Sequence, residues 1–316
     1  MSKKFPRSVC FLGMGSSYYA SVYAKYLLQE VAHIDARVEL ASEFLHYPPL
    51  VRRGQAFVAV SQSGESVETV KAVRFLREKH ASVIGVTNRA NSKLAALSQR
   101  ILLTHAGDEK ASATKTFAST LALMHLLAIS AGVHSGYVKR SKFTRSSKRM
   151  LECAQSMRKQ IPRWEPRIKR LVDRFANDQT VAVLGRGYNL AAALQGAVLL
   201  KEVAKLPAEG MSAGEFMHGP IEMSSRGMLA VVLLGGHTSR LMRSLVRKLG
   251  RYGTDVLTIG PERVGSTEAI CLKERDQTLI PISAIVCLDL LAYFLALKRR
   301  LNPDEFRHIS KVTLTE

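Results

Sequence analysis

Several features that are common in secreted, metal-binding and membrane-spanning proteins are missing from this sequence. It has only four cysteines in 316 residues, with no CxxC pair and no metal-ligand spacing. No uninterrupted apolar run reaches the roughly 18 to 20 residues of a membrane span, and the N-terminal lysines lead into a strand pattern rather than a signal peptide. These absences predict a cytoplasmic protein with no membrane partner and no bound metal. Because Cys10 and Cys287 lie in apolar runs, we expect buried free thiols there.

Acidic residues are also scarce, with 26 Asp and Glu against 46 Lys and Arg, which gives a net charge of +20. Much of the basic excess lies in residues 139–173, which contain the only tryptophan of the chain. This stretch has neither the interleaved aromatic residues nor the Cys/His finger of common nucleic-acid-binding segments. We therefore expect a solvated helical connector and no nucleic-acid partner, with the charge helping to attract anionic metabolites.

The most informative segment is residues 57–66, FVAVSQSGES, within a chain that is 47% hydrophobic and therefore globular. A short β-prone run ends at Ser61, and a helical pattern opens at Glu65. A helix that begins after a strand offers free backbone N–H groups and a positive dipole end to an anion. The serine hydroxyls and the Gln62 amide add donors, and Gly64 lets the backbone approach a ligand closely. One serine would suffice for a helix cap, so this crowding predicts a phosphate-binding loop.

The chain repeats itself at a nearly constant interval. VCFLGMGSS at 9–17 recurs as VAVLGRGYN at 181–189, and their central glycines, Gly13 and Gly185, are 172 residues apart. Two further strand patterns recur with nearly the same offset, 57–60 at 230–234 and 82–88 at 255–261. A shared offset indicates a duplicated domain. The predicted fold class is α/β, with two tandem doubly wound parallel sheets, each a three-layer αβα, flavodoxin-like domain.

The repeats predict a first domain at 1–140, a basic helical connector at 141–170 and a second domain at 171–316. Neither GxG turn is a dinucleotide fingerprint, because the third glycine and the acidic residue on the next strand are missing. The second half has also lost the serine loop, with Gly235-Gly236-His237-Thr238 in its place. The sequence thus predicts one phosphate position, built mainly by the first half, and no cofactor.

Three motifs make the chain resemble the sugar isomerase (SIS) family: GMGSS at 13–17, SQSGES at 61–66 and KEVAKLPAEGMSAGEFMHGP at 201–220. The resemblance covers nearly the whole chain and is greatest to the double-SIS isomerase portion of glucosamine-6-phosphate synthase. It implies a homodimer with its active site at the subunit interface. It also implies a phosphorylated aminosugar or fructosamine substrate.

The resemblance also implies roles for individual residues. A glutamate that moves a proton between C1 and C2 of the sugar corresponds to Glu202, and a histidine that promotes ring opening, usually from the neighbouring subunit, corresponds to His218. A tail lysine that folds over the substrate corresponds to Lys311. The residues expected to bind the substrate are Ser17, Ser61, Gln62, Ser63, Ser66 and Thr114. From the residues alone, Glu202 could equally be a polar helix end, His218 a structural histidine and Lys311 a frayed surface lysine.

Three departures from the synthase pattern shape the expected function. No glutaminase domain precedes the first SIS half, the lysine that forms an imine with the sugar is replaced by Leu199, and a sugar-contacting serine is replaced by Ala113. Phosphate binding and proton transfer are expected to remain, whereas glutamine-dependent amination is not. The leading interpretation is a glucosamine-6-phosphate deaminase that releases ammonia and fructose 6-phosphate. A fructosamine 6-phosphate deglycase, a plain aldose–ketose isomerase and a non-enzymatic sugar-phosphate sensor stay open as alternatives.

Overall fold

The computed structural model describes residues 6, 8–48, 51, 55–175, 180–308 and 310. The chain divides into two compact units, and each is described by itself. The first unit runs to Lys148 and also takes in the residues from Arg307 onward, and the second runs from Arg149 to Phe306. The expected domain limits at 140 and 171 remain a prediction.

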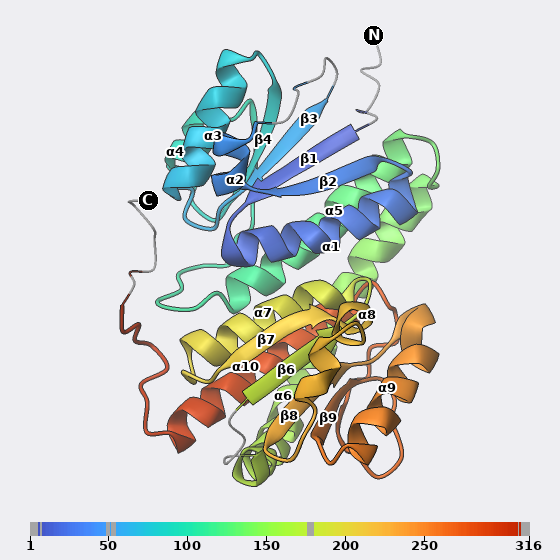
Figure 1. The fold of residues 1–316 in the computed structure, drawn as a ribbon. Coiled ribbons are helices and arrows are strands. Elements are labelled where there is room, and N and C mark those ends of the chain that lie inside the picture. The colour runs from blue at the N-terminus through green and yellow to red at the C-terminus, as the bar shows by residue number, and fades with distance from the viewer. Residues whose placement is uncertain are drawn as a thin grey trace. The chain divides into compact units, whose positions relative to one another are not determined.

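The first unit is built on a parallel sheet of five strands in the order β2-β1-β3-β4-β5 (Figure 1). Its strands are β1 Ser8–Gly13, β2 Asp35–Leu40, β3 Ala56–Val60, β4 Ser82–Thr87 and β5 Arg100–Leu103. The central strand β3 is buried at every position, as expected for the apolar run at its core. This order is the flavodoxin-like order of doubly wound sheets.

Helices cover both faces of the first sheet. These are α1 Gly15–Ala32, α2 Ala41–His46, α3 Val67–Glu78, α4 Lys93–Leu97 and α5 Lys115–His134. Helices α2, α3 and α4 share an apolar core with one face of the sheet, in which Phe44 packs edge-on against Phe57. Helices α1 and α5 pack against each other on the other face (Figure 1). The result is the three-layer arrangement that was predicted.

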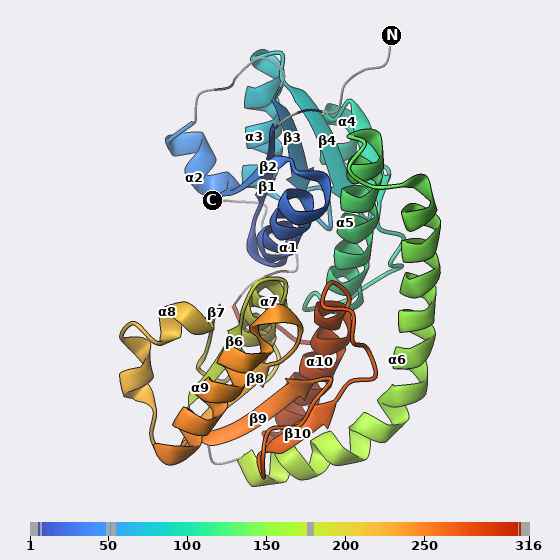
Figure 2. The same cartoon turned by 90° about the vertical axis from the view of Figure 1, so that its right-hand side faces the viewer.

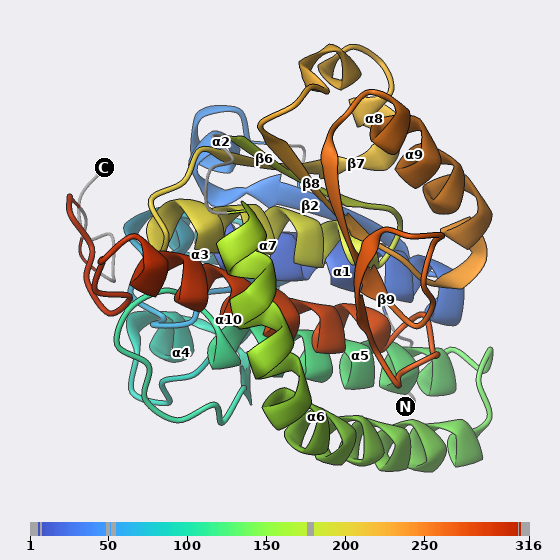
Figure 3. The same ribbon diagram turned by 90° about the horizontal axis from the view of Figure 1, so that it is seen from below.

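The second unit repeats this plan with the parallel order β10-β9-β8-β6-β7. Its strands are β6 Thr180–Gly185, β7 Ala208–Ser212, β8 Met228–Leu233, β9 Asp255–Gly260 and β10 Glu268–Cys271. Its helices are α7 Asn189–Glu202, α8 Ala213–Phe216, α9 Ser239–Arg251 and α10 Ile280–Lys298, with short 3-10 turns η1 Pro220–Met223 and η2 Gly236–Thr238. Helices α7 and α10 lie together on one face, and α8 and α9 cover the other (Figure 3). The predicted duplication of a doubly wound domain is confirmed.

A single helix, α6 Arg140–Phe175, contains the whole segment expected to be a basic connector, and it is curved (Figure 2). It includes Pro162 and Pro166, each of which removes a backbone hydrogen bond from the helix. Several of its arginines pair with acids of the second unit: Arg149 with Glu274 and Asp276, Arg167 with Glu268, and Arg174 with Glu268 and Asp255. Part of the basic excess therefore serves to hold α6 over the edge strand β10, which would otherwise be open to pairing.

Two helices, α5 and α10, are long and apolar enough to cross a membrane by length and composition alone. Polar residues such as Asp289 interrupt the apolar runs, so no uninterrupted run reaches this length, although the average hydropathy of each helix is high. Of their most apolar windows, 56% and 72% of the residues are buried inside the structure. Since α5 packs on α1 and α10 on α7, a core position accounts for this apolar character.

The four cysteine thiols differ in their burial within the two cores. Cys10, Cys153 and Cys287 are buried, whereas Cys271 is exposed, so the expectation for Cys10 and Cys287 is confirmed. Burial raises the pKa of Cys10 to about 12 and that of Cys153 to about 11, and it raises the pKa of Cys287 well above its ordinary value. At pH 8 these three groups hold their protons and cannot act as thiolate nucleophiles.

We therefore predict that the native protein reacts with a thiol reagent at one fast site at pH 8, and at four sites in denaturant. Cys271→Ser should abolish the fast reaction. A second fast thiol in that variant would contradict the burial of the two cores.

Candidate functional site

The first sheet has a switch point between β1 and β3, where the chain leaves neighbouring strands toward opposite faces. The strand β1 leads through Met14 into α1 on one face, and β3 leads through residues 61–66 into α3 on the other. Parallel strands end at the same edge, so Ser17 and the predicted phosphate loop lie at that edge together. Such a switch point is where doubly wound sheets bind their ligands.

The backbone of this loop is fixed by its neighbours. The Ser61 N–H donates to the Val86 carbonyl at 3.0 Å, and the Gln62 carbonyl accepts from Asn88 N–H at 3.0 Å. Gly64 has a φ of +69°, and a Cβ placed on it would lie 2.1 Å from the Ser92 hydroxyl. Only glycine fits both this conformation and this space, so the sequence requires Gly64 for the shape of the loop.

The same loop presents hydrogen-bond donors. The Ser61 hydroxyl accepts from Gly64 N–H and the Ser63 hydroxyl from Glu65 N–H, both at 3.1 Å, so each can still donate its own proton. In the part of the chain that the structure describes, the backbone N–H groups of Ser63, Ser66 and Val67 have no acceptor. The loop also opens the 12-residue helix α3, whose dipole favours an anion at this end. This is the donor set that a phosphate needs.

A carboxylate lies within the loop, but its charge is balanced. Glu65 accepts from the Lys93 backbone N–H at 2.9 Å and pairs with the Lys93 ammonium at 3.0 Å. These two contacts hold the pKa of Glu65 below its ordinary value. The pair therefore stabilises the loop at neutral pH, and its contribution declines as the pH falls through that lowered pKa. With Glu65 neutralised locally, an incoming anion meets less repulsion.

Ser66 and Thr114 have hydroxyls that are already engaged in hydrogen bonds within the protein. Ser66 donates to Glu68 at 3.1 Å, and Thr114 donates to Glu109 at 3.2 Å. Because each hydroxyl has one proton, these two could only accept from a ligand while they keep these partners. Their predicted contact with the substrate remains a prediction.

Glu202 is the last residue of α7 in the second unit, and it is half-buried. A carboxylate at a helix C-terminus faces the negative end of the helix dipole. Lys205, three residues later, has a φ of +53° and turns back so that its ammonium donates to the Glu202 carbonyl. The same ammonium donates to the Glu305 carbonyl at 3.1 Å. Lys205 thus joins the end of α7 to the segment that leads into the C-terminal tail.

Sequence reasoning missed Lys205. The residue stands three positions after Glu202, but its role depends on a left-handed turn and on a segment 100 residues away. A lysine just after a predicted helix end was the one available signal, since cations favour helix C-termini. Lys311, which was expected to cover the substrate, lies outside the described residues.

His218 is held at the opposite edge of the second sheet from Glu202. Its backbone N–H donates to the Glu215 backbone carbonyl at 2.9 Å, and the turn continues through Gly219, with a φ of +134°, into η1. The side chain is exposed. Strand β7 separates the two residues, and its five residues carry the chain about 15 Å across the sheet. Within the second unit of one chain, therefore, Glu202 and His218 are not brought together.

Leu199, which was expected to correspond to the synthase lysine, is fully buried in the body of α7. It supplies no amine. No group of three or more His, Cys, Asp or Glu side chains suited to a metal ion occurs among the described residues.

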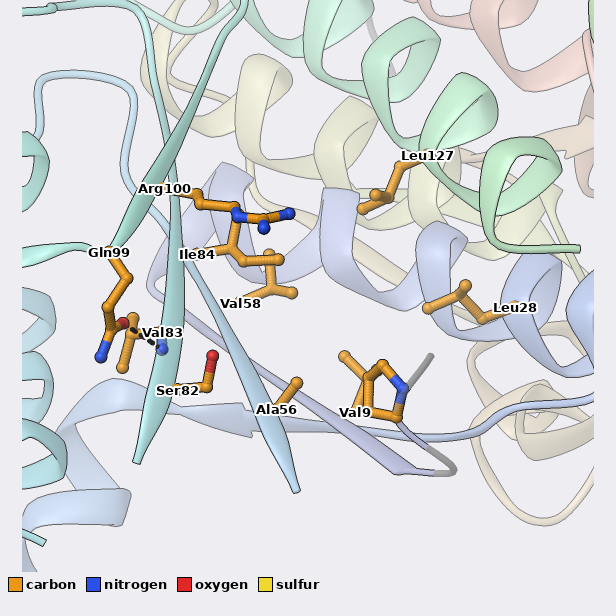
Figure 4. A pocket seen from close by; sticks show the side chains of 11 residues that line it. Val9, Leu28, Ala56, Val58, Ser82, Val83, Ile84, Gln99, Arg100 and Leu127 are labelled. Carbon is orange, nitrogen blue, oxygen red and sulfur yellow. Dashed lines mark hydrogen bonds between the residues drawn. The ribbon is translucent and has the colours of Figure 1, made fainter. Parts of the chain in front are cut away.

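A cavity of about 390 Å³ in the first unit is lined by residues outside the loop at 61–66. Its walls include Val9, Ala56, Ser82 and Arg100, each at or next to the first residue of its strand, so the cavity lies at the amino edge of the sheet. Its lining is mainly apolar, with the Arg100 side chain extending across it (Figure 4). It is not the candidate site.

Comparison with known proteins agrees with this geometry. A family model described as "SIS domain" matches residues 6–130 and 174–287. A glutamine–fructose-6-phosphate aminotransferase (isomerizing) of Pyrococcus horikoshii is 32% identical over 314 residues, which are 98% of this chain and 52% of that protein. The chain thus spans about half the length of the curated relatives it matches.

Two solved structures share the fold. The C-terminal domain of glucosamine-fructose-6-phosphate aminotransferase from Francisella tularensis gives a TM-score of 0.90 at 22% identity, covering 95% of this chain and 87% of that one. A glucosamine-6-phosphate deaminase from Thermotoga maritima gives a TM-score of 0.78 at 22% identity, covering 98% of this chain and 91% of that one.

We predict that Ser61→Ala and Ser63→Ala each weaken the binding of a phosphorylated sugar by roughly ten- to a hundredfold, because each removes a hydrogen bond to a charged group, worth about 1.5–3 kcal/mol. Calorimetric titration measures this loss. Ser82→Ala is the matched control, since Ser82 is exposed at the start of β4, at the other edge of the sheet. If both loop variants bound like the parent protein, the loop would be only a helix cap.

Proposed function

We propose, since this chain belongs to the SIS domain family, that it binds a phosphorylated aminosugar and moves a proton between C1 and C2 of the open sugar. The specific activity that we propose is a glucosamine-6-phosphate deaminase, with fructose 6-phosphate and ammonia as products. The observation that carries the proposal is the loop at Ser61–Ser66, with hydroxyl protons that can be donated and backbone N–H groups that have no acceptor among the described residues. A phosphate is the ligand that such a loop fits best.

The proposed chemistry needs one base. Glu202 removes the proton from C2 of the open aldehyde, the electron pair forms the C1–C2 double bond, and the aldehyde oxygen takes a proton from water, which gives an enolamine and a hydroxide. The resulting carboxylic acid gives its proton to C1, and the nitrogen lone pair forms an iminium at C2. The hydroxide adds to C2 of that iminium, its proton passes to the nitrogen as the C–N bond breaks, and ammonia departs from a ketose phosphate. Atoms and charge balance without an oxidant or a second substrate other than water.

Leu199 supports the release of ammonia by water rather than an exchange through an enzyme-bound imine. An imine with the sugar needs a primary amine at the reacting carbon, and the buried side chain at this position is a hydrocarbon. The half-buried position of Glu202 at the end of an apolar helix suits a base that is partly shielded from water.

The separation of Glu202 and His218 supports a site built by two copies of the chain. Both groups are proposed to act on the same sugar, one on C1 and C2 and the other on ring opening. Because β7 separates Glu202 from His218 by about 15 Å within one chain, the two side chains of one second unit cannot both contact the same sugar. If a second copy of the chain supplies His218, both groups can contact one sugar. A two-fold dimer is the simplest such assembly.

We predict that Glu202→Gln keeps substrate binding nearly unchanged and lowers turnover by roughly 10²–10⁴-fold, the usual loss on removal of a general base. The measurement is ammonia release, together with deuterium incorporation at C1 of fructose 6-phosphate in deuterated water. Glu209→Gln is the matched control, because Glu209 is an exposed glutamate on β7. Ammonia release that persists in Glu202→Gln would overturn the assignment, and a free amino acid released from a fructosamine 6-phosphate would identify a deglycase instead.

We also predict that two inactive variants restore activity when they are mixed. Glu202→Gln protomers lack the base and His218→Ala protomers lack the ring-opening acid, so a mixed dimer contains one site with both intact groups. Activity should recover to about a quarter to a half of the parent level, as expected when mixed dimers form and one of their two sites works. No recovery in mixed dimers verified by mass spectrometry would place both residues in one subunit.

A further inference from the structure

Arg186 is a cation that the proposed reaction does not use. It follows β6 directly, at the carboxyl edge of the second sheet, and it is half-buried. Its guanidinium lies over Gly214, because a Cβ built there would be 3.1 Å from the Arg186 Nη2 atom. Among the described residues, no carboxylate pairs with this guanidinium. A partly buried charge without a counter-ion is costly unless a ligand supplies one.

A second cation and a hydroxyl share a cavity with Arg186. The cavity, of about 180 Å³, lies between α8 and α9, and its lining includes Lys248 and Ser244 but no Asp or Glu. Lys248 is half-buried. Helix α9 has five basic residues and no acidic one, and Arg243 alone among them forms an ion pair in the described part of the chain. The potential in this cavity is therefore positive.

The rim of the cavity is apolar. Leu241 is 56% exposed and Met217 is 37% exposed, and both line the cavity. Exposed apolar side chains beside a pair of cations suit a ligand with an anionic head and a carbon skeleton. Inorganic phosphate alone would leave this rim uncovered.

We propose that this cavity, defined by Arg186, Ser244 and Lys248 with Leu241 and Met217 at its rim, binds an organic phosphate monoester. The planar guanidinium of Arg186 can donate two parallel hydrogen bonds to a phosphate, and Lys248 supplies a second positive charge against the dianion. The Ser244 hydroxyl adds a donor. This site lies wholly in the second unit and shares no residue with the loop at Ser61–Ser66.

Binding at this site would have one consequence for the reaction. Met217 directly precedes His218, so a ligand held against Met217 also holds the turn that carries this histidine. That consequence rests on the proposed function, whereas ligand binding itself does not.

Calorimetric titration with phenyl phosphate tests the site, in a Ser61→Ala/Ser63→Ala background that weakens the other phosphate position. We expect about one phenyl phosphate per chain in this background. Adding Arg186→Gln or Lys248→Gln to this background should weaken the binding of phenyl phosphate by roughly ten- to a hundredfold, because each substitution removes a charge-assisted contact. Inorganic phosphate should bind more weakly than phenyl phosphate, and acetate more weakly still.

The matched control is Arg247→Gln, which removes the same charge from the exposed surface of α9 outside the cavity. It should leave the affinity for phenyl phosphate within about twofold of that of the background protein, since an exposed charge outside the cavity is largely screened by salt. The site is refuted if phenyl phosphate does not bind in the loop background, or if Arg247→Gln weakens binding as much as Lys248→Gln does. Should Arg186→Gln fail to fold, Lys248→Gln with unchanged melting temperature decides the question alone.

Discussion

Parallel pairing of β1 with β3 is the interaction on which the first unit depends. Because the two strands run side by side and end together, the helices that follow them must start at one edge. Right-handed crossovers then take α1 and α3 to opposite faces, so the loop at 61–66 lies where the two helices diverge. Among the residues that the structure describes, the backbone N–H groups of Ser63, Ser66 and Val67 have no acceptor, and those of Ser66 and Val67 belong to the unpaired start of α3. The position of the proposed phosphate-binding loop thus depends on strand order, and its serines add hydroxyl donors.

The second unit has the same parallel pairing, between β6 and β8, but it lacks the serine loop. Asn189 stands where Ser17 stands in the first unit, and its side-chain oxygen is buried without a partner among the described residues. Gly235 and Gly236 replace the serine loop. The proposed base, in contrast, lies at the far end of α7, where the helix dipole is negative and Lys205 offsets it. Duplication kept the scaffold in both units, while the proposed base lies at the amino edge of the second sheet and the loop at 61–66 lies at the carboxyl edge of the first.

The sequence sufficed to predict features whose signal is local. The buried run at 57–60, the glycine turn at Gly13 and the 172-residue offset to Gly185 led to the duplicated α/β fold, which is confirmed, whereas phosphate binding by the loop at 61–66 stays a prediction. Short edge strands were not predicted, because a strand such as β5, Arg100–Leu103, is partly exposed and lacks a continuous apolar run. Neither Lys205 nor Arg186 could be identified from the sequence. The hydrogen bond from Lys205 to the Glu305 carbonyl and the position of Arg186 over Gly214 are defined only in the folded chain.

The distance between Glu202 and His218 shows how closeness in sequence can mislead. Both belong to one continuous motif, and only 16 positions separate them in the sequence. The strand β7 lies between them, however, and a strand of a parallel sheet always carries the chain from one edge to the other. No rearrangement of side chains can undo that crossing while β7 stays paired with β6. If both residues serve one reaction, the smallest complete site must therefore be larger than one second unit, and its assembly depends on contacts between chains.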